Sequence, residues 1–517
     1  MNAAEHHRRR FSFGRDNFAS LEMADKSNNF ENFLKQTASA NVVPVVETLT
    51  ADLLTPLAVY LKLARNAAHS FLFESVEGGE SLGRYSFIGA NPEMIVSGGD
   101  AQTFVLKNGE TTTLEISLFD FLRGYFAAKK ICDVSGLPAF VGGAIGFFGF
   151  SCAGWFEKSV KRNETIGEDA KLMFFKNVVA FDHAKQVIKI ASLVFTDEAA
   201  NDAELKNLYE NAVAENARLK DILENQPLQI PNSKFQIPDS KTVESNWKRA
   251  DFENAVREIK EMIAAGECYQ VVLSQCFTRK TNADAVAIYR ALRSLNPSPY
   301  MFLLKIGEQE IVGASPEMLV KSIDRKLEYR PIAGTRKRGA TAKEDDFLAV
   351  EMRNDAKEVA EHLMLVDLGR NDLGRVAKFG SVKVENLMQV EKYSHVQHLV
   401  SYLHADLRDE FDAFDALAAC FPAGTVSGAP KVRAMQIIQK LEPTPRGIYS
   451  GAVGYIDYSG NLDVCITIRT LVLENGAAEI QAGAGIVADS IPELEFEETV
   501  NKAQALLRTI EIAEGAE

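Results

Sequence analysis

The sequence lacks the features that would place the protein in a membrane or on nucleic acid. In 517 residues, no stretch reaches the roughly 18–20 consecutive apolar residues needed to cross a bilayer. The basic start, residues 1–17, has no apolar core and so does not resemble a secretory signal. Lys and Arg number only 57 against 71 Asp and Glu, which gives a net charge of −14. This deficit argues against nucleic-acid or membrane-surface binding, because phosphate contacts depend largely on Lys and Arg.

Cysteine is also scarce, with six residues spread along the chain: Cys132, Cys152, Cys268, Cys276, Cys420 and Cys465. No two are spaced C-x-x-C, and none is accompanied by nearby histidines as in a zinc site. The pattern argues against a zinc centre and predicts free thiols in a reducing compartment. We therefore expect a cytoplasmic protein.

What is present fits a globular protein, with 46% hydrophobic and 25% charged residues. One composition shift divides the chain, because residues 223–247 hold three prolines and many polar residues between two helical patterns. We expect this segment to be a linker. The other expected regions are a flexible tail over residues 1–39, an N-terminal region over 40–222 and a C-terminal region over 248–517.

The local patterns predict a mixture of helices and antiparallel strands. Apolar runs broken by glycine-rich turns predict hairpins at 85–99, 102–116 and 301–315, and a single strand at 268–280. Helices are predicted at 19–26, 202–225, 251–267 with Asp251 as N-cap and Gly266 as stop, and 344–369 ending at Gly369. Without a regular βαβ rhythm, this mixture indicates an α+β protein with large antiparallel sheets.

The glycine-rich segment 136–150, "GLPAFVGGAIGFFGF", resembles a phosphate loop only superficially. It lacks the lysine of a phosphate loop and has no clear strand-to-helix setting for a dinucleotide. Close packing of backbones is the favoured interpretation.

The helical pattern at 489–511 carries an unusual density of acids. Ser490 and Glu493 have the spacing of a capping box, with Pro492 in the first turn. Capping accounts for Glu493 but not for Glu495 and Glu498, which lie three residues apart on one face. Lys502 lies four residues further along that face.

A second acidic pair, Glu358 and Glu361, has the same spacing in another predicted helix. Each pair alone is typical of a solvated helix face. Together, two such pairs indicate a shared divalent cation, and oxygen ligands without Cys or His favour Mg²⁺ or Mn²⁺. The residues themselves leave both interpretations open.

Nine blocks in one order resemble the chorismate-utilising enzymes, and among these most closely the large subunits (component I) of anthranilate synthases. The resemblance covers roughly residues 40–512. The blocks are "GECYQVVLSQ" (266–275), "GASPEML" (313–319), "RPIAGTRKRG" (330–339), "EVAEHLMLVDLGRNDLGRV" (358–376), "HLVS" (398–401), "FPAGTVSGAPKVRAM" (421–435), "GAVGYID" (451–457), "ITIRT" (466–470) and "QAGAGIVADSIPELEFEET" (481–499). No single block would suffice, but their shared order makes a chance resemblance implausible.

The resemblance implies a fold, a reaction and a set of cofactors. The expected fold is the α+β (α/β) chorismate-binding enzyme fold, a two-sheet antiparallel β-sandwich flanked by helices, with the catalytic region over 248–517. The expected reaction is a lyase reaction that converts chorismate and ammonia to anthranilate and pyruvate, the first step of tryptophan biosynthesis. The expected cofactor is Mg²⁺.

The resemblance also implies roles for individual residues. The metal shell would be Glu358, Glu361, Glu495 and Glu498. The enolpyruvyl carboxylate would be held by Arg469, Tyr449, Lys502 and the backbone of Gly483, Ala484 and Gly485. Glu317 would be the general acid and His398 the general base, with Gly334, Thr335 and Thr425 near the ring. Apart from the resemblance, a surface salt bridge is the less favoured alternative for Arg469, whereas a packed core histidine is the favoured interpretation of His398.

Two positions discriminate within the family. Members that add water at C2 carry lysine where this chain has Gln270, and a neutral glutamine cannot serve as a base toward water. Relatives that make aminodeoxychorismate carry lysine where this chain has Ala333. Both positions favour anthranilate as product. The alternatives are component I of an aminodeoxychorismate synthase, an isochorismate or salicylate synthase, and an inactive tryptophan-binding subunit.

The segment "LFESVEGGESLGRYSFIG" (72–89) resembles the tryptophan feedback site of the family, and "NPSPYMF" (296–302) supplies its partner segment. We hypothesise that L-tryptophan inhibits the enzyme from a pocket remote from the metal. The expected pocket residues are Glu74, Ser75, Pro299, Tyr300, Met301, Val453 and Tyr455. A buried strand end would explain the apolar residues of 71–73 equally well, but it would not require Ser75.

The resemblance implies a partner and shows one departure. No cysteine lies in a nucleophile-elbow context, so a separate glutamine amidotransferase subunit (component II) is implied, in an expected heterotetramer. The departure lies in "GFFGFSCAGWFEK" (146–158), where Ser151 and Gly154 replace an acid and an arginine that are common in the family.

Overall fold

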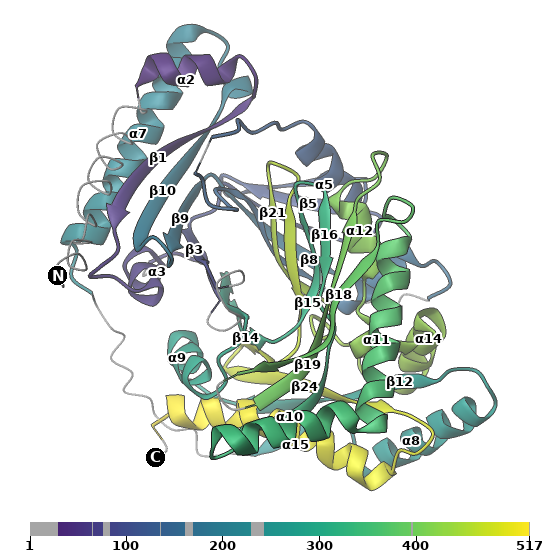
Figure 1. Ribbon diagram of the computed structural model, residues 1–517. Coiled ribbons are helices and arrows are strands. Elements are labelled where there is room, and N and C mark those ends of the chain that lie inside the picture. The colour runs from purple at the N-terminus through teal and green to yellow at the C-terminus, as the bar shows by residue number, and fades with distance from the viewer. Residues whose placement is uncertain are drawn as a thin grey trace, which may run out of the picture.

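The computed structural model describes residues 29–64, 66–75, 83–134, 136–160, 169–228, 242–393 and 396–515. Two large antiparallel sheets dominate these residues, with helices around them (Figure 1). The α+β sandwich expected from the sequence is therefore confirmed.

The first sheet has twelve strands drawn from the whole chain. Its order is β1 (Val42–Thr50), β10 (Val187–Phe195), β9 (Asn177–Asp182), β3 (Tyr85–Ala90), β2 (His69–Glu74), β13 (Tyr300–Ile306), β14 (Gln309–Ser315), β23 (Thr470–Glu474), β24 (Ala477–Ile486), β12 (Gln270–Lys280) and β11 (Val243–Ser245), with β20 (Gly428–Ala429) paired to β12.

The second sheet also has twelve strands. Its order is β17 (Ile332–Lys337), β19 (Val396–Asp406), β16 (Lys326–Tyr329), β15 (Met318–Ile323), β22 (Leu462–Ile466), β21 (Ala452–Asp457), β7 (Gly143–Phe148), β8 (Ala170–Phe175), β4 (Met94–Gly98), β5 (Thr103–Lys107) and β6 (Glu110–Leu114), with β18 (Lys383–Lys392) paired to β19.

Alternation along the strands creates the layers. In β2, Phe71 packs in a core with Phe140, Phe175 and Cys465, which joins the two sheets. Its neighbour Leu72 points to the opposite face and packs in a core with residues of the covering helices. Alternate side chains of the same strand therefore fill the core between the two sheets and the core beneath the outer helices.

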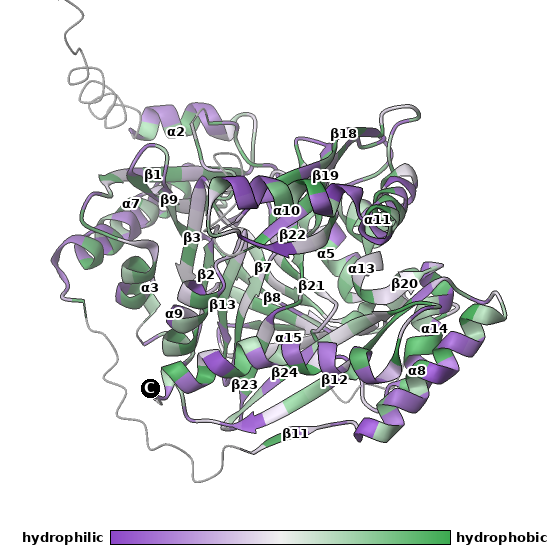
Figure 2. Ribbon diagram, turned by 60° about the horizontal axis from the view of Figure 1, so that its bottom comes forward, coloured by the Kyte–Doolittle hydropathy of each residue, from purple (hydrophilic) through white to green (hydrophobic). Residues whose placement is uncertain are grey.

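Helices cover the outer faces of both sheets. The helices are α2 (Phe30–Thr37), α3 (Pro56–Ala64), α5 (Leu118–Ala127), α6 (Ala153–Phe156), α7 (Asp202–Asn225), α8 (Arg249–Ala264), α9 (Ala285–Leu295), α10 (Ala342–Asn354), α11 (Ala356–Gly374), α12 (Ala413–Cys420), α13 (Gly424–Ser427), α14 (Lys431–Leu441) and α15 (Pro492–Ala513), with 3₁₀ turns at Phe150–Cys152 and Thr196–Glu198. Figure 2 shows hydrophilic residues along α10 and both kinds of residue on α8 and α15. Within the described ranges, no helix is long and apolar enough to cross a membrane.

The boundary expected at 223–247 does not separate the sheets. Helix α7 continues to Asn225 and β11 begins at Val243, while residues 229–241 lie outside the described residues. Both sheets contain strands from 40–222 and from 248–517. The two regions are consequently segments of sequence that build one sandwich together.

The N-terminal segment is partly ordered, in contrast to the flexible tail expected over 1–39. Helix α2 lies within that range, and the ring of Phe33 packs 4.9 Å from that of Tyr209 on α7. Burial of these aromatic side chains fixes the helix against α7. The helix predicted at 19–26 lies outside the described residues.

The long helix predicted at 344–369 is wrong in two respects. It is broken at Asp355, whose carboxylate accepts from the N–H groups of Lys357 and Glu358 and so begins α11 as a new helix. It also continues past Gly369 to Gly374. Gly369 is needed for close packing, because a Cβ there would lie 2.5 Å from Cε1 of Tyr329.

Three further local predictions were wrong. Strands β3 and β4 do not form the hairpin predicted at 85–99, because they belong to different sheets. Helix α8 begins at Arg249, so Asp251 lies in its first turn. Helix α15 begins at Pro492 without a side-chain cap, and the Ser490 hydroxyl instead accepts from the N–H of Val487.

The hairpins predicted at 102–116 and 301–315, the strand at 268–280 and the helix at 202–225 are confirmed. Gly266, with a φ of +81°, follows the C-terminal end of α8 as expected. All six cysteines are free thiols.

The packing of Gly369 generates a stability prediction. Gly369→Ala should lower the midpoint of thermal unfolding, because overpacking costs roughly 1–3 kcal/mol while the gain in helix propensity is only about 1 kcal/mol. The matched control is Gly374→Ala on the same helix, where an added Cβ meets no atom within 4 Å. Equal midpoints for the two variants would contradict this account of Gly369.

Candidate active site and inter-sheet cavity

His398 lies on β19 beside the positive-φ turn of β17. Its Nδ1 is 2.9 Å from the carbonyl oxygen of Gly334 and 3.1 Å from the hydroxyl of Thr335. A carbonyl only accepts, so Nδ1 carries the proton and Nε2 keeps its lone pair. Burial lowers the pKa of His398, opposed by the Gly334 hydrogen bond and reinforced by the charge of Arg469. The ring is therefore a neutral base near pH 7.

Glu317 is the buried acid of the site. Burial raises its pKa to about 8, and the nearby Thr425 hydroxyl of α13 offsets part of that rise. Neither Oε1 of Glu317 nor the Thr425 hydroxyl completes a hydrogen bond within the described residues. Its backbone is fixed, since the Glu317 carbonyl accepts from the N–H of Ile466 at 3.0 Å. Glu317 is thus a protonated carboxylic acid at neutral pH with an unused donor.

Arg469 is a largely buried cation without a carboxylate partner among the described residues. Desolvation lowers its pKa, and the nearby Tyr449 and Glu498 act in the opposite direction. Its backbone has a φ of +52°, which is uncommon for a side chain of this size. The surface salt bridge considered from the sequence is absent from the described part of the chain. A desolvated guanidinium in a strained loop is suited to binding an anion.

The segment Gly483–Ala484–Gly485 lies on β24, paired with β12. A Cβ at Gly483 would lie 2.8 Å from the Tyr449 hydroxyl, and one at Gly485 would lie 2.5 Å from Nε2 of Gln270. These glycines therefore allow both polar side chains to approach the strand closely. Lys502 joins them from α15, donating to the Gly483 carbonyl at 2.8 Å and pairing with Glu498 at 2.7 Å.

The four glutamates on α11 and α15 interact electrostatically. Burial raises the pKa of Glu361, and the charges of Glu358 and Glu498 raise it further. Burial likewise raises the pKa of Glu495, with Glu498 adding to the rise. Glu358 is paired with Arg336 at 2.9 Å, and a Cβ on Gly334 would lie 3.3 Å from its Oε2. The glutamates thus face the site from two helices.

No three acidic, His or Cys side chains in the described ranges gather closely enough to form a complete metal cage. Glu493 and Glu497 are separate from the group, since they pair with Arg257 and Arg249 of α8 at 3.3 and 2.7 Å.

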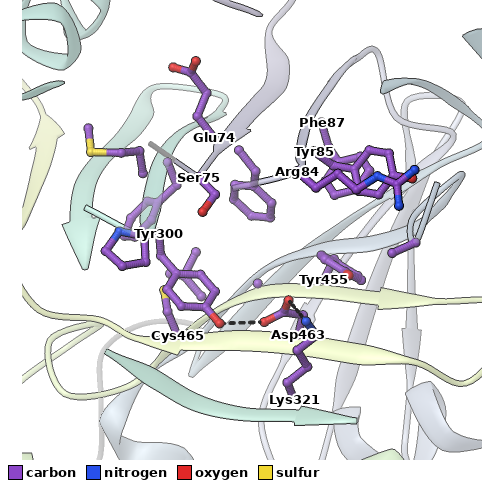
Figure 3. A pocket seen from close by; sticks show the side chains of 17 residues that line it. Glu74, Ser75, Arg84, Tyr85, Phe87, Tyr300, Lys321, Tyr455, Asp463 and Cys465 are labelled. Atoms are coloured by element: carbon purple, nitrogen blue, oxygen red, sulfur yellow. Dashed lines mark hydrogen bonds and ion pairs between the residues drawn. The ribbon is translucent and has the colours of Figure 1, made fainter. Parts of the chain in front are cut away.

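A cavity of about 310 Å³ lies between the two sheets, away from the site just described (Figure 3). All seven residues expected in a tryptophan pocket line it, from β2 and the segment after it, from β13 and the segment before it, and from β21. The Ser75 hydroxyl is buried and has no hydrogen-bond partner among the residues that the structure describes. Tyr300 donates to Asp463 at 3.0 Å, and Figure 3 shows this pair at one end of the cavity.

Known proteins show which family has this arrangement. The family model described as chorismate binding enzyme matches residues 68–508. Two relatives named anthranilate synthase component 1 are each 44% identical: that of Acetivibrio thermocellus over 92% of this chain and 96% of its own, and that of Pseudomonas aeruginosa over 94% and 99%. The crystal structure of anthranilate synthase component I from Streptococcus pneumoniae has a TM-score of 0.71 at 35% identity, covering 89% of this chain and 99% of its own.

The chain belongs to the chorismate binding enzymes.

Several residues that the sequence reasoning missed support this chorismate binding enzyme site. Arg336 holds Glu358 and also pairs with Glu351 and Asp355 at 3.2 and 3.0 Å. Arg330, Glu391 and Tyr393 form a buried hydrogen-bonded group, and the Tyr393 ring lies 5.6 Å from that of His398. Arg336 stands in a quoted block, but its partners are set by the break at Asp355, which no local pattern revealed.

The cavity also has lining residues that were not predicted, namely Phe73, Arg84, Tyr85, Phe87, Ala139, Phe302, Lys321, Gly454, Asp463 and Cys465. Two of them could have been found from the hairpin pattern. Val453 is paired with Cys465 and Tyr455 with Asp463 across β21 and β22. Directly opposed residues of paired strands lie on the same face of the sheet. The predicted residues Val453 and Tyr455 therefore implied that their partners, Cys465 and Asp463, also line the cavity.

The departure at Ser151 has a local explanation. The Ser151 hydroxyl donates to Asp169 at 2.6 Å, and Nε1 of Trp155 donates to the other carboxylate oxygen at 3.2 Å. Asp169 thereby has neutral donors here. Gly154 lies in the short helix α6.

The unpaired state of Arg469 generates the second prediction. Arg469→Met should abolish activity yet raise the free energy of unfolding by roughly 0.5–2 kcal/mol, because it removes a strained, desolvated charge. The contrasting variant is Arg446→Met, since Arg446 is buried and pairs with Glu442 at 2.7 Å. Its loss should destabilise the protein by about 3–5 kcal/mol. Thermal unfolding of both proteins measures the difference, and destabilisation by Arg469→Met would contradict the anion-site assignment.

Proposed function

We propose that the protein is the large subunit of an anthranilate synthase, which converts chorismate and ammonia to anthranilate and pyruvate. The observation that carries the proposal is the largely buried Arg469, which has no carboxylate partner among the described residues, beside a neutral His398. An enzyme acting on a dicarboxylate needs such a cation, and pyruvate elimination needs such a base. Relatives named anthranilate synthase component 1, at 44% identity over most of the chain, support the same function.

Substrate binding rests on fixed positive charge and close backbone approach. Arg469 offers two parallel N–H donors to the enolpyruvyl carboxylate, and Tyr449 and Lys502 add single donors. Gly483 and Gly485 let the strand approach an anion without side-chain obstruction. Binding in a region from which water is excluded strengthens each of these contacts.

Glu317 acts as the general acid. The C4 hydroxyl of chorismate is a poor leaving group and departs as water only if it receives a proton. A carboxylic acid with a pKa of about 8 holds that proton at neutral pH and gives it up in the reaction. The addition of ammonia at C2 then accompanies the loss of the C4 oxygen.

His398 acts as the general base in the second half of the reaction. Nε2 takes the proton from C2 as the C3–O bond breaks and the ring becomes aromatic. The enolpyruvyl group leaves as the enolate of pyruvate, which becomes pyruvate when its methylene carbon takes up a proton. The Gly334 carbonyl stabilises the imidazolium that forms, because it accepts from Nδ1–H in both protonation states.

We further propose that Mg²⁺ is held by Glu361 and Glu498, with Glu358 and Glu495 assisting. The donor set fits, because all four ligands are hard oxygens. Burial raises the pKa values of Glu361 and Glu495, and the charge of Glu498 raises both further. Mg²⁺ commonly uses one or two carboxylates with waters and substrate oxygens. When bound, the ion neutralises the ring carboxylate and orients it.

The nucleophile in this proposal is ammonia supplied by a separate glutamine amidotransferase subunit. Gln270, whose side chain lies beside Gly485, is neutral and cannot deprotonate water. Ammonia needs no such base. Free ammonia from an excess of ammonium salt should therefore support turnover without the partner subunit.

L-Tryptophan is the ligand proposed for the inter-sheet cavity. Aromatic and aliphatic walls suit an indole, while Arg84, Lys321 and Asp463 supply charges of both signs for an amino acid's carboxylate and ammonium. Binding there would inhibit from outside the active site.

The direct test is an assay of the purified protein with chorismate, Mg²⁺ and ammonium. Anthranilate is detected by its fluorescence without any added lyase, and chelation of Mg²⁺ should abolish its formation. Tryptophan at millimolar concentration should inhibit. Accumulation of a 4-amino product would instead favour the aminodeoxychorismate-forming relatives, and turnover unaffected by tryptophan would remove the regulatory part of the proposal.

The pKa directions predict a bell-shaped dependence of kcat on pH. Protonated Glu317 is present below pH 8, so activity should fall as pH rises through about 8. On the acid side, activity should fall only below pH 6.5, because the pKa of His398 is lowered from that value. Glu317→Gln should reduce kcat by about 10²–10⁴-fold and remove the alkaline limb.

The matched control is Asp457→Asn. Asp457 is another buried acid, with its pKa raised by burial to about 7, but it serves the turn between β21 and β22 by accepting from Ser459 and Asn461. This variant should keep the alkaline limb. Persistence of the limb in Glu317→Gln would show that Glu317 is not the titrating acid.

A further inference from the structure

The inter-sheet cavity and the active site are connected through the backbone at the end of strand β14. Tyr300 and Met301 of β13 line the cavity. In the register of the first sheet, they lie directly opposite Ser315 and Ala314 of β14. Two residues after Ser315 the chain reaches Glu317. The backbone that carries the general acid is therefore paired with the wall of the cavity.

Ser315 connects this strand end to the second sheet. It is fully buried, and its hydroxyl donates to the carbonyl of Ile466 at 2.7 Å. The N–H of the same Ile466 donates to the carbonyl of Glu317 at 3.0 Å. Ile466 follows Cys465, which lines the cavity. Both backbone groups of Ile466, the residue after the lining residue Cys465, thus hold the Ser315–Glu317 segment.

The neighbouring residue extends the connection to the anion site. The N–H of Ala314 donates to the carbonyl of Arg469 at 3.1 Å. Arg469 has a positive φ, so its backbone depends on such contacts to keep the guanidinium in place. One hydrogen bond therefore separates the cavity strand pair from each of two residues assigned to chemistry and substrate binding.

We propose that Ser315 is a positioning residue that couples occupation of the inter-sheet cavity to the setting of Glu317. A ligand between Tyr300 and Cys465 contacts two residues on opposite sheets. Ser315 lies opposite Tyr300 on the paired strand and is hydrogen-bonded to Ile466, the residue after Cys465. A change in the distance between the sheets must therefore be taken up at the Ser315–Ile466 hydrogen bond, which alters the direction of the Glu317 side chain.

The regulatory part of this inference rests on the proposed function of the cavity as the tryptophan site. The positioning part does not, since the contacts to Ile466 exist without a ligand. A merely structural serine would affect stability alone. A coupling serine must also change how tryptophan acts and how the acid titrates, and both effects can be measured.

The experiment compares Ser315→Ala with the parent protein, using ammonium as nitrogen donor in the presence of Mg²⁺. Calorimetry gives the affinity for L-tryptophan, and kinetics with and without saturating L-tryptophan give the factor by which it weakens apparent chorismate affinity. We expect the tryptophan affinity of Ser315→Ala to stay within about threefold while that coupling factor falls by about fivefold or more. We also expect the alkaline limb of kcat to shift.

Two further variants control for folding. Ser322→Ala removes another buried serine from the neighbouring strand β15, opposite Leu462 of β22, and should keep both the coupling factor and the alkaline limb. Ser315→Thr retains the hydroxyl and should restore both relative to Ser315→Ala, even if its thermal midpoint is lower.

The outcomes separate this inference from the proposed function. If the parent protein does not bind L-tryptophan, the proposed tryptophan site is refuted. The positioning role of Ser315 is then decided only by whether the alkaline limb shifts in Ser315→Ala. An unchanged limb together with an unchanged coupling factor in Ser315→Ala would overturn the inference. Loss of tryptophan binding only in Ser315→Ala would also overturn it, because Ser315 would then belong to the binding pocket itself.

Discussion

The unpaired guanidinium of Arg469 is the constraint on which the rest of the site depends. A buried cation without a counter-ion is unstable unless the surrounding structure holds it in place. Its support comes from backbone contacts, with Ala314 binding its carbonyl and the end of β22 leading into its positive-φ turn. The strain and the desolvation are offset by the large sandwich around them, and they leave one strong anion-binding group free for a substrate.

The same logic separates the two titrating groups of the reaction. Glu317 and His398 are both buried, but burial favours the protonated form of a carboxyl and the neutral form of an imidazole. One environment therefore produces an acid that keeps its proton and a base that lacks one. Hydrogen bonds adjust both groups further. The Gly334 carbonyl fixes the tautomer of His398, and the Thr425 hydroxyl offsets part of the rise in the pKa of Glu317.

Much of this arrangement could be predicted from sequence, because it is local or carried by ordered motifs. The confirmed elements, such as the strand at 268–280 and the hairpin at 301–315, have clear periods and turns. The failures arose where tertiary contacts override local signals. Gly369 resembles a helix stop but faces Tyr329 across a tight helix–sheet contact, and Ser490 has capping-box spacing but serves the preceding loop. The pairing of β3 and β4 with different sheets is likewise invisible to a pattern that sees only two adjacent strands.

The cavity illustrates which site residues a linear pattern can reveal. Glu74, Tyr300 and Val453 are far apart in sequence, yet each stands in a sequence segment that resembles the family. Asp463 and Arg84 needed the strand register or the fold. The composition of residues 223–247 likewise could not show whether they separate two domains. A shift in composition marks where the chain crosses a surface and carries no information on which strands pair. Since both sheets use strands from both sides of that boundary, the cavity is lined by residues of both regions, whereas Ser315 and its contacts with Tyr300 and Ile466 belong to 248–517 alone. In the coupling proposed for Ser315, a displacement at the cavity therefore reaches Glu317 within the second region, through paired backbone that is stiff enough to transmit it.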